Sequence, residues 1–456
     1  MSDANTANTA NTAYLDTHPD EPRELLERLC RQPSVAAQHL GMPEMADLIE
    51  SLLRETGFRT ERLSIPDAPP IIYGELRGAS DYTLLLYNHY DVQPPEPFEL
   101  WESPPFEPTE RDGRLYARGI SDNKGEIAAR LSAIRALQSS GTLPITLRWI
   151  IEGEEEVGSP HFERIIAPHA DKLRADACFW EGAGFNPFDQ PDLGLGSKGL
   201  LYVQLDVSAL GKDAHSGAAA ILPSAAWRLV QALATLKAPD GTVTIPGFYD
   251  AVRQPTPEQL DVIRAHPPMD DVLREGYQTE RFLGDATGHA IFERSAFSPT
   301  CNIAGLLSGY TGEGTKTVLP ASAMAKIDFR LVPDQDPADI RDKLRAHLDA
   351  NGYSDITLTV FSLAEPVVTS LEEPLVQKVS AIAQEFAGKP PSITLISGGT
   401  LPLLAGLRRV VGVPGLSAPG NAAYWASGAH SPNEHIRLSD LDRAVRFNCH
   451  MFSHLG

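Results

Sequence analysis

Several widely spaced segments carry histidines and carboxylates of the kinds that bind divalent metal ions. His89 and Asp91 stand two apart in NHYDVQP, and Asp122 follows in ARGISDNKG. Residues two apart in extended chain share a face, so Asp91 can hold one imidazole nitrogen of His89 while the other nitrogen faces a metal ion. Further along the chain the same chemistry is available from Glu155, Glu156, Glu181 and His430.

Each of these residues also has an ordinary structural explanation. A histidine at a strand end is usually structural, Asp122 before a helix could be its N-cap, and acidic runs such as EGEEEVGS are usually solvated. This acidic run, however, directly follows an apolar strand, where like charges are costly unless a cation or protons neutralise them. Adjacent carboxylates also point differently, so one can bind a metal ion while its neighbour reaches the bound water.

The elements expected to position these residues are strands that end where candidate ligands begin. Buried strands are predicted over the apolar segments 83–87, 145–151 and 177–180. The carboxyl ends of strands in an open α/β sheet gather ligands in one crevice, so the side chains that follow these strands could converge. A helix is predicted over 124–138, with one apolar face. His430 lies in a loop rich in Gly, Ser, Pro and Asn.

Length and composition favour an ordinary globular protein of two domains. The chain has 456 residues, more than one core usually holds, and a formal net charge of −21. This charge disfavours nucleic acid and anionic membranes as partners. No apolar run of about eighteen residues predicts a membrane span, and the N-terminus lacks the features of a secretory signal, so a cytoplasmic location is expected by default. The four cysteines are scattered and are expected to be buried.

The order of the predicted elements indicates an α/β domain with a mixed, mostly parallel sheet flanked by helices, into which an α+β unit is inserted. The inserted unit is expected to contain three alternating strands and the helices 223–236 and 337–351. We expect a disordered tail over 1–20, the first part of the α/β domain over 21–197, the inserted unit over 198–363, and the second part of the α/β domain over 364–456.

Other catalytic motifs are absent or misplaced. GLGSKG over 194–199 has the dinucleotide-binding spacing but precedes a strand, whereas that motif must open a helix. GYTGEGTKT resembles a phosphate-binding loop, yet Thr315 stands where the lysine should be. No GxSxG elbow and no HExxH helix occurs, so the sequence lacks the nucleophile motif of serine hydrolases and the zinc-binding motif of ordinary zincins.

Six motifs in this order resemble family twenty of the metallopeptidases, the co-catalytic dinuclear enzymes. They are NHYDVQP, ARGISDNKG, EEEVGS, DAHSG, FRLVPDQDP and AHSPNE. The family includes aminoacylase, carnosinase-type dipeptidases, bacterial glutamate carboxypeptidase and succinyl-diaminopimelate desuccinylase. The similarity covers nearly the whole chain after the tail and implies that the α/β domain is catalytic and that the inserted unit is a lid and dimerisation domain.

The resemblance implies a pair of metal ions and a ligand set for each. His89, Asp122 and Glu181 would bind one ion. Asp122, Glu156 and His430 would bind the other, so that Asp122 bridges the pair, and the peptide bond after Asp122 would be cis. Because the ligands are only nitrogen and oxygen atoms, Zn²⁺ suits the site best, and Mn²⁺ or Co²⁺ stay possible.

The resemblance also implies roles for residues that do not bind metal. Glu155 would be the general base, and Asp91 would orient His89. His215 in DAHSG would stabilise the oxyanion from the partner subunit, which makes a homodimer part of the mechanism. Arg330 would bind a substrate carboxylate through its planar fork, although an ion pair on a strand is the simpler explanation. Weaker candidates for substrate contact are Asn302, Gly398, Gly399 and Thr400.

These assignments predict a dimeric amide hydrolase that cleaves dipeptides or the C-terminal residue of short peptides. The metal pair would activate a bridging water as nucleophile, and Glu155 would pass its proton to the leaving amine. Glu181 favours the carboxypeptidase and acyl-amino-acid branches, whereas the long insertion over 236–298 is similar to the lids of the dipeptidase branch. An alternative function is that of an N-acyl amino acid deacylase that uses the same metal centre. A catalytically silent metal-binding dimer is disfavoured by Glu155, since a binding protein needs no general base.

Overall fold

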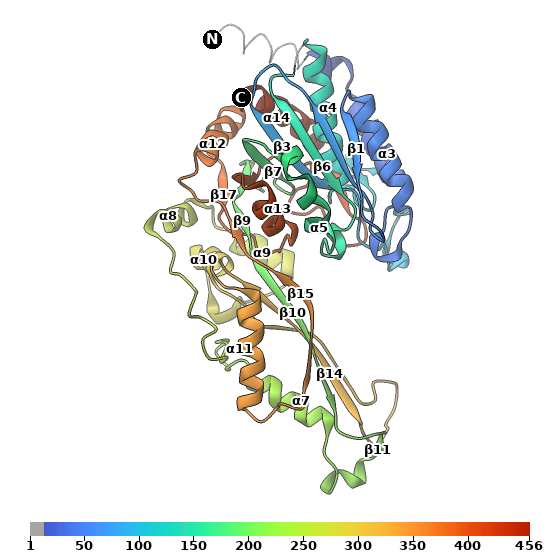
Figure 1. Cartoon of the computed structure of the whole chain (residues 1–456), viewed down its shortest axis with the longest axis vertical. Coiled ribbons are helices and arrows are strands. Elements are labelled where there is room, and N and C mark those ends of the chain that lie inside the picture. Colours follow the sequence, from blue (N-terminus) through green and yellow to red (C-terminus); the bar gives the residue numbers. More distant parts are fainter. Residues whose placement is uncertain (1–12, 142) are drawn as a thin grey trace. The chain divides into compact units, whose positions relative to one another are not determined.

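The chain folds into two compact units, both of which are discontinuous in sequence. The computed structural model describes residues 13–141 and 143–456. The first unit comprises the described residues up to Gly196 together with Thr369–Leu395 and Gly406–Gly456, and the second comprises Ser197–Val368 and Ile396–Ala405. Blue and red segments, from the two ends of the sequence, therefore share the first unit (Figure 1). The short segment Ile396–Ala405 groups with the inserted unit, which the sequence did not indicate.

The first unit is built on an eight-stranded mixed sheet with the strand order β1-β2-β6-β3-β7-β18-β8-β17. The pairs β6–β3, β3–β7, β7–β18 and β8–β17 are parallel, and the remaining pairs are antiparallel. The strands are β1 Arg59–Leu63, β2 Ile71–Leu76, β3 Thr83–His89, β6 Thr146–Glu152, β7 Ala177–Trp180, β8 Asp192–Gly194, β17 Ser392–Thr394 and β18 Gly415–Ser417. The predicted mixed, mostly parallel sheet is confirmed.

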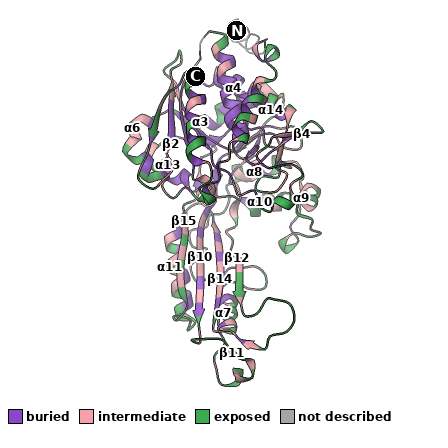
Figure 2. Cartoon of the chain, turned by 90° about the vertical axis from the view of Figure 1, so that its right-hand side faces the viewer, coloured by how far each residue is buried: buried purple, intermediate pink, exposed green. Residues whose placement is uncertain are grey.

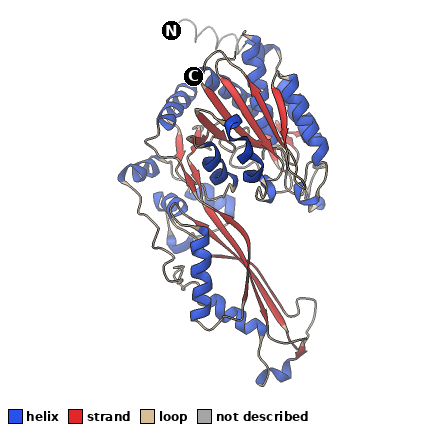
Figure 3. Ribbon diagram, in the orientation of Figure 1, coloured by secondary structure: helices blue, strands red, loops and turns tan. Residues whose placement is uncertain are grey.

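Helices lie in front of this sheet and behind it (Figure 3). They are α2 Glu21–Arg31, α3 Met42–Glu55, α4 Lys124–Ser139, α5 Phe162–Ile166, α6 Ala170–Leu173, α12 Pro374–Ala387, α13 Leu403–Val411 and α14 Leu438–His454. A small sheet of β4 Thr109–Arg111, β5 Arg114–Tyr116 and β19 His435–Arg437 completes the unit. The predicted apolar face of α4 is buried, and the helix is also buried on nearly every other side (Figure 2). Its charged residues Glu126 and Arg130 pair with each other at 2.6 Å.

The second unit has a four-stranded antiparallel sheet with the order β12-β14-β10-β15. The strands are β10 Gly199–Ser208, β12 Asn302–Ser308, β14 Ser322–Leu331 and β15 Thr357–Ala364, and a short ladder joins β11 Ala214–His215 to β13 Val318–Leu319. Alternate residues of β10, from Leu201 to Val207, are buried in a core with α7 Ala225–Ala234 and α11 Pro337–Ala350. The insertion adds α8 Pro257–Ala265, α9 Asp270–Tyr277 and α10 His289–Phe297. The predicted α+β unit is confirmed.

Two boundaries differ from the sequence-based prediction. Strand β3 continues to His89, two residues beyond its predicted end, because it pairs in parallel with β6 as far as Glu152. The predicted disordered tail ends earlier than residue 20, since residues 13–17 are helical and the Tyr14 hydroxyl donates to Glu21 at 2.8 Å. Residues 1–12 of that tail lie outside the described part.

All four cysteines are buried and free, as expected. In the described part of the chain, no helix is long and apolar enough to cross a membrane.

Candidate metal centre

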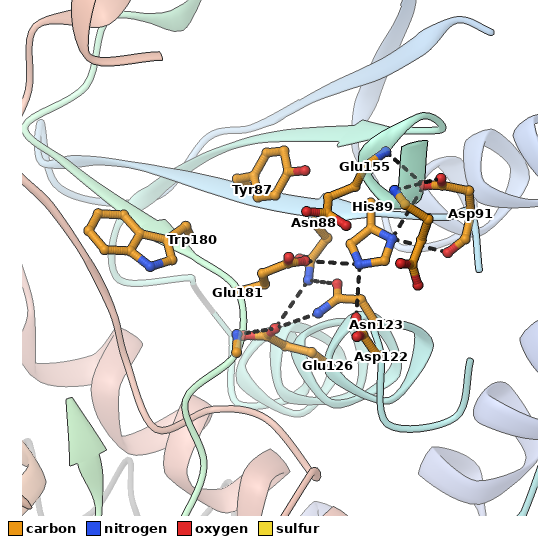
Figure 4. A network of polar contacts seen from close by, with 12 residues as sticks. Tyr87, Asn88, His89, Asp91, Asp122, Asn123, Glu126, Glu155, Trp180 and Glu181 are labelled. Carbon is orange, nitrogen blue, oxygen red and sulfur yellow. Dashed lines mark hydrogen bonds and ion pairs between the residues drawn. The ribbon is translucent and has the colours of Figure 1, made fainter. Parts of the chain in front are cut away.

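The carboxyl ends of three neighbouring strands bring the first candidate ligands together. β3 lies between β6 and β7, and it ends at the fully buried His89. The 3-10 turn Glu155–Val157 follows β6, and Glu181 directly follows β7. In Figure 4, the side chains of Glu155 and Glu181 both lie near the His89 imidazole. The predicted convergence at the strand ends is therefore present in the structure.

Five predicted ligands form two clusters that share Asp122. In one cluster, His89 Nε2 lies 3.0 Å from Asp122 Oδ1 and 3.2 Å from Glu181 Oε2. In the other, His430 Nε2 lies 3.1 Å from Asp122 Oδ2 and 3.3 Å from Glu156 Oε2. Ligand atoms about 2.1 Å from a tetrahedral ion are about 3.4 Å apart, so both clusters have nearly the spacing of a coordination shell.

Asp122 can serve both clusters because its two carboxylate oxygens contact different histidines, Oδ1 His89 and Oδ2 His430. Asn123, not Asp122, occupies the N-cap position of this helix, and no side chain caps it. The alternative that Asp122 is a helix cap is therefore wrong. The peptide bond between Asp122 and Asn123 is cis, as the family resemblance implies.

The carboxylates of the two clusters create a negative potential that stabilises positive charge on the neighbouring histidines. Hydrogen bonds to Asp122 and Glu156 raise the pKa of His430 to about 10. Burial opposes the charged form of His89, but the Glu181 and Asp122 carboxylates outweigh it and raise its pKa well above the usual value. The buried Glu181 Oε2 accepts no hydrogen bond from the described residues. Imidazole and carboxylate donors with an orphaned oxygen fit a pair of divalent cations.

Asp91 touches both halves of the centre. Its Oδ1 lies 3.3 Å from His89 Nδ1, and its backbone carbonyl oxygen lies 3.0 Å from the same nitrogen. The carboxylate also accepts hydrogen bonds from the backbone amides of Glu155 and Glu156, at 3.2 and 3.0 Å. With Nδ1 held in this way, His89 presents Nε2 to Asp122 and Glu181.

Glu155 lies next to the clusters, and its carboxylate accepts no hydrogen bond from the described residues. In contrast, Glu156 accepts one from Gln93 Nε2 at 2.8 Å. Burial raises the pKa of Glu155 to about 7, aided by the nearby Glu156, Asp122 and Asp91 carboxylates, although His89 opposes the rise. A free carboxyl of this kind can accept and return a proton near neutral pH.

The sequence-based analysis missed Glu434, which holds the loop before Asp122. Glu434 is buried, pairs with Arg118 at 2.8 Å, and accepts hydrogen bonds from the backbone amides of Gly119, Ser121 and Asp122. The available signal was its place in AHSPNE, four residues after His430. One buried carboxylate thereby ties the His430 loop to the Asp122 loop.

A second missed group is the buried polar network beneath His89 (Figure 4). Asn88 donates to Asn123 and Glu126, and Glu126 accepts from the backbone amide of Gly182 at 3.2 Å. Arg130 Nη1 donates to the Tyr87 carbonyl oxygen at 2.8 Å. These bonds join the end of β3, the start of α4 and the loop that follows Glu181. The network therefore fixes the spacing of three ligand-bearing segments.

A family model described as Peptidase family M20/M25/M40 matches residues 85–454. The chain belongs to this family. The predicted family, and with it the assignment as a metallopeptidase hydrolase, is confirmed.

Known relatives of this metallopeptidase cover most of its length. It is 28% identical over 386 residues to Beta-Ala-His dipeptidase of Homo sapiens, covering 81% of this chain and 74% of the relative. It is 26% identical over 397 residues to Cys-Gly metallodipeptidase dug1 of Schizosaccharomyces pombe, covering 84% and 82%. The crystal structure of an M20 family metallo-carboxypeptidase from Sulfolobus solfataricus is 35% identical, with a TM-score of 0.90 over 95% of this chain and 99% of that one.

The remaining predicted site residues of the metallopeptidase lie in the second unit. His215 is exposed, and its Nδ1 accepts a hydrogen bond from the backbone amide of Gly217 at 3.0 Å. Because an accepting Nδ1 carries no proton in the neutral ring, the proton is on Nε2, which lies 3.4 Å from Thr317 Oγ1. His215 therefore presents a hydrogen-bond donor at the surface of its unit.

The predicted substrate residues are linked to one another within the second unit. Arg330 Nη1 donates to Thr400 Oγ1 at 2.8 Å, and Asn302 Nδ2 donates to Asp328 at 2.8 Å. Arg330 Nε lies 3.9 Å from Asp328, too far for a firm ion pair, so the guanidinium is not neutralised on its strand. Arg330 and Gly398 line a cavity of about 770 Å³. A side chain at Gly398 or Gly399 would meet no atom within 4 Å.

Proposed function

We propose that this metallopeptidase binds two divalent metal ions and cleaves dipeptides or removes the C-terminal residue of short peptides. The observation that carries the proposal is the pair of clusters that share the two oxygens of Asp122. The names of the similar proteins, two dipeptidases and a metallo-carboxypeptidase, support this substrate class. Zn²⁺ is the best match to the donor set, with Mn²⁺ and Co²⁺ as the alternatives.

The proposed mechanism assigns one task to each group around the centre. When bound, the two ions would polarise the scissile carbonyl group and lower the pKa of the attacking water. His89, Glu181 and Asp122 would hold one ion, and His430, Glu156 and Asp122 would hold the other. Glu155 takes the proton of the water and delivers it to the leaving amine, because its carboxylate is uncommitted.

His215 is proposed to donate from Nε2 to the developing oxyanion of the partner subunit's substrate. Its surface exposure and its tautomer suit this role. The second unit also exposes large apolar side chains on β12 and β15, the two outer strands of its sheet, namely Ile303, Leu306, Leu307, Phe361 and Leu363. Apolar side chains exposed on outer strands are available to an interface, which supports a homodimer formed through this unit.

Arg330 is proposed to bind the free carboxylate of the substrate. Among the described residues, Thr400 is the one close polar side-chain partner of the guanidinium, so its remaining N–H groups can form the two parallel hydrogen bonds that a carboxylate accepts. Asn302, Gly398, Gly399 and Thr400 are proposed to line the same substrate pocket. This arrangement would select peptides with an unblocked C-terminus.

The test is metal depletion followed by reconstitution. The purified protein would be stripped with a chelator, supplied with Zn²⁺, Mn²⁺ or Co²⁺ singly, and assayed with matched panels of dipeptides and N-acetyl amino acids. We expect metal-restored cleavage of the dipeptides. Preferential cleavage of the N-acetyl amino acids would instead assign an N-acyl amino acid deacylase.

A Glu155→Gln variant tests the general base separately. It should bind the same number of ions as the wild type and lose about 10²–10⁴-fold in kcat, since general-base catalysis typically contributes this much. Full activity of this variant would refute the proposed mechanism. Two bound ions without turnover of either panel by the wild type would indicate a silent metal-binding dimer.

A further inference from the structure

The C-terminal helix α14 carries two histidines that face helix α12 within the first unit. His450 and His454 are four residues apart, so they lie one turn apart on the same face of α14. Their ring centroids are 4.2 Å apart. Phe386 of α12 packs against His450, with ring centroids at 5.6 Å, and its neighbour Glu385 is exposed. Figure 1 shows α12 and α14 next to each other near the C-terminus.

These three residues can present donor atoms to one point. His450, His454 and Glu385 each offer one ligand atom, and the three atoms lie within 4.8 Å of one another. Nitrogen and oxygen ligands of a tetrahedral Zn²⁺ are about 3.4 Å apart, so the atoms need to close by at most about 1.4 Å. A change of rotamer in the exposed Glu385 side chain can bring its carboxylate closer to the two imidazole rings.

The tautomer of His454 suits metal binding. Its Nδ1 lies 2.7 Å from the His450 carbonyl oxygen, which can only accept a hydrogen bond. Nδ1 therefore carries the proton, and Nε2 keeps its lone pair for a ligand. A carbonyl oxygen behind the imidazole is a common partner of metal-binding histidines, because it fixes both the tautomer and the ring orientation.

An independent observation points to a ligand at the same place. His450 is 5% exposed, and neither ring nitrogen has a hydrogen-bond partner among the described residues. A buried polar group without a partner destabilises the folded state, and such groups are rare in native proteins.

We propose that His450, His454 and Glu385 bind an additional transition-metal ion of the zinc class. The site shares no residue with the metal centre described above. Two imidazole nitrogens and one carboxylate favour Zn²⁺, Cu²⁺ or Ni²⁺ over Mg²⁺ and Ca²⁺, which prefer oxygen ligands. The ion joins α12 to α14, and binding to the folded state alone stabilises that state. Its role is to fasten the C-terminal helix to α12.

The experiment counts zinc ions in the full-length protein. Wild type, His454→Ala and Glu385→Gln would be dialysed against zinc buffered at micromolar free concentration and analysed for metal per chain. His289→Ala, a substitution at another exposed histidine, is the matched control. We expect wild type and the control to hold one ion more than His454→Ala. The difference does not depend on how many ions the catalytic centre holds, so it is separate from the proposed function.

Thermal unfolding provides the second readout. With the catalytic centre already loaded, further zinc should raise the Tm of the wild type and of His289→Ala, and should leave the Tm of His454→Ala and Glu385→Gln unchanged. Both variants change side chains at the edge of the helix pair, and their metal-free Tm values check that they fold. Equal zinc contents in all four proteins, or a wild-type difference that appears only at millimolar zinc, would overturn the proposal.

Discussion

The carboxylate of Asp91 accepts a hydrogen bond from the backbone amide of Glu156 at 3.0 Å, although Asp91 was expected only to orient His89. The same carboxylate lies 3.3 Å from His89 Nδ1. One buried side chain therefore joins a ligand of the first cluster to the loop that carries a ligand of the second. Changing it should disturb both halves of the centre, whereas changing a residue that contacts one ligand should disturb one half.

An Asp91→Ala variant should weaken the binding of both metal ions by about 10–100-fold, the usual effect of removing a partner that orients metal ligands. The matched variant is Gln93→Ala, because Gln93 donates only to Glu156 among the ligands. The Gln93→Ala variant should weaken the binding of only one of the two ions. Competition with a chromophoric chelator would measure the two affinities. Indistinguishable titrations of the two variants would contradict the linking role of Asp91.

An Arg330→Lys variant should lose about 10–100-fold in kcat/KM for a dipeptide with a free C-terminus, since a hydrogen bond to a charged group contributes about 1.5–3 kcal/mol. Lysine keeps the charge but not the planar fork. The C-terminal amide of the same dipeptide is the control substrate, and its cleavage by wild type and variant should differ little. An equal loss for both substrates would mean that Arg330 does not bind the carboxylate.

A Glu434→Gln variant should lower the free energy of unfolding by about 3–5 kcal/mol, because it leaves Arg118 buried without its counter-ion. Glu61→Gln, which breaks the exposed pair with Lys172, should cost less than about 1 kcal/mol. Urea unfolding of the metal-free proteins would measure both changes. Similar losses would show that the buried position of Glu434 is unimportant for stability.

Asp192 should make the protein less stable as the pH rises towards neutrality. Burial raises the pKa of this carboxyl to about 7, against the hydrogen bonds from Ser392 and Asn186. The folded state therefore binds the proton more tightly than the unfolded state, whose pKa is about 4. The stabilisation is complete below about pH 4 and is lost as the pH rises through about 7.

An Asp192→Asn variant isolates this effect. Relative to the variant, the wild type should lose about 2–4 kcal/mol of its free energy of unfolding between pH 4 and pH 8, because one pKa unit corresponds to about 1.4 kcal/mol. Denaturant titrations of both proteins at several pH values would show it. Parallel pH profiles would mean that Asp192 is charged in the folded protein throughout this range.

The parts of the metal centre that follow apolar strands were predictable from the sequence. His89 and Glu181 stand at the ends of short buried strands, and parallel pairing brings such ends together. The bridging position of Asp122 followed from the family resemblance, since no spacing in the sequence indicates that one carboxylate reaches two clusters. Glu434 was not predictable, because its partners lie more than three hundred residues earlier in the chain.

Prediction of the elements succeeded where the hydrophobic pattern is local. Strand Ala177–Trp180 has the predicted bounds and helix Pro337–Ala350 ends one residue before its predicted end, whereas the full burial of α4 depends on the elements packed around it. A periodic apolar face predicts one buried side of a helix. It does not show whether the charged residues on the other sides are also buried and paired. The Glu126–Arg130 pair is such a case.

The place of β18 in the sheet has a consequence for synthesis of the chain. β18 lies between β7 and β8, although the whole second unit is translated between β8 and β18. The core residues of the second unit run from Leu201 to Ile356, so that core can form as soon as its own segment leaves the ribosome. The unit in the middle of the sequence can thus finish folding first, while the unit that begins the chain waits for its last strands.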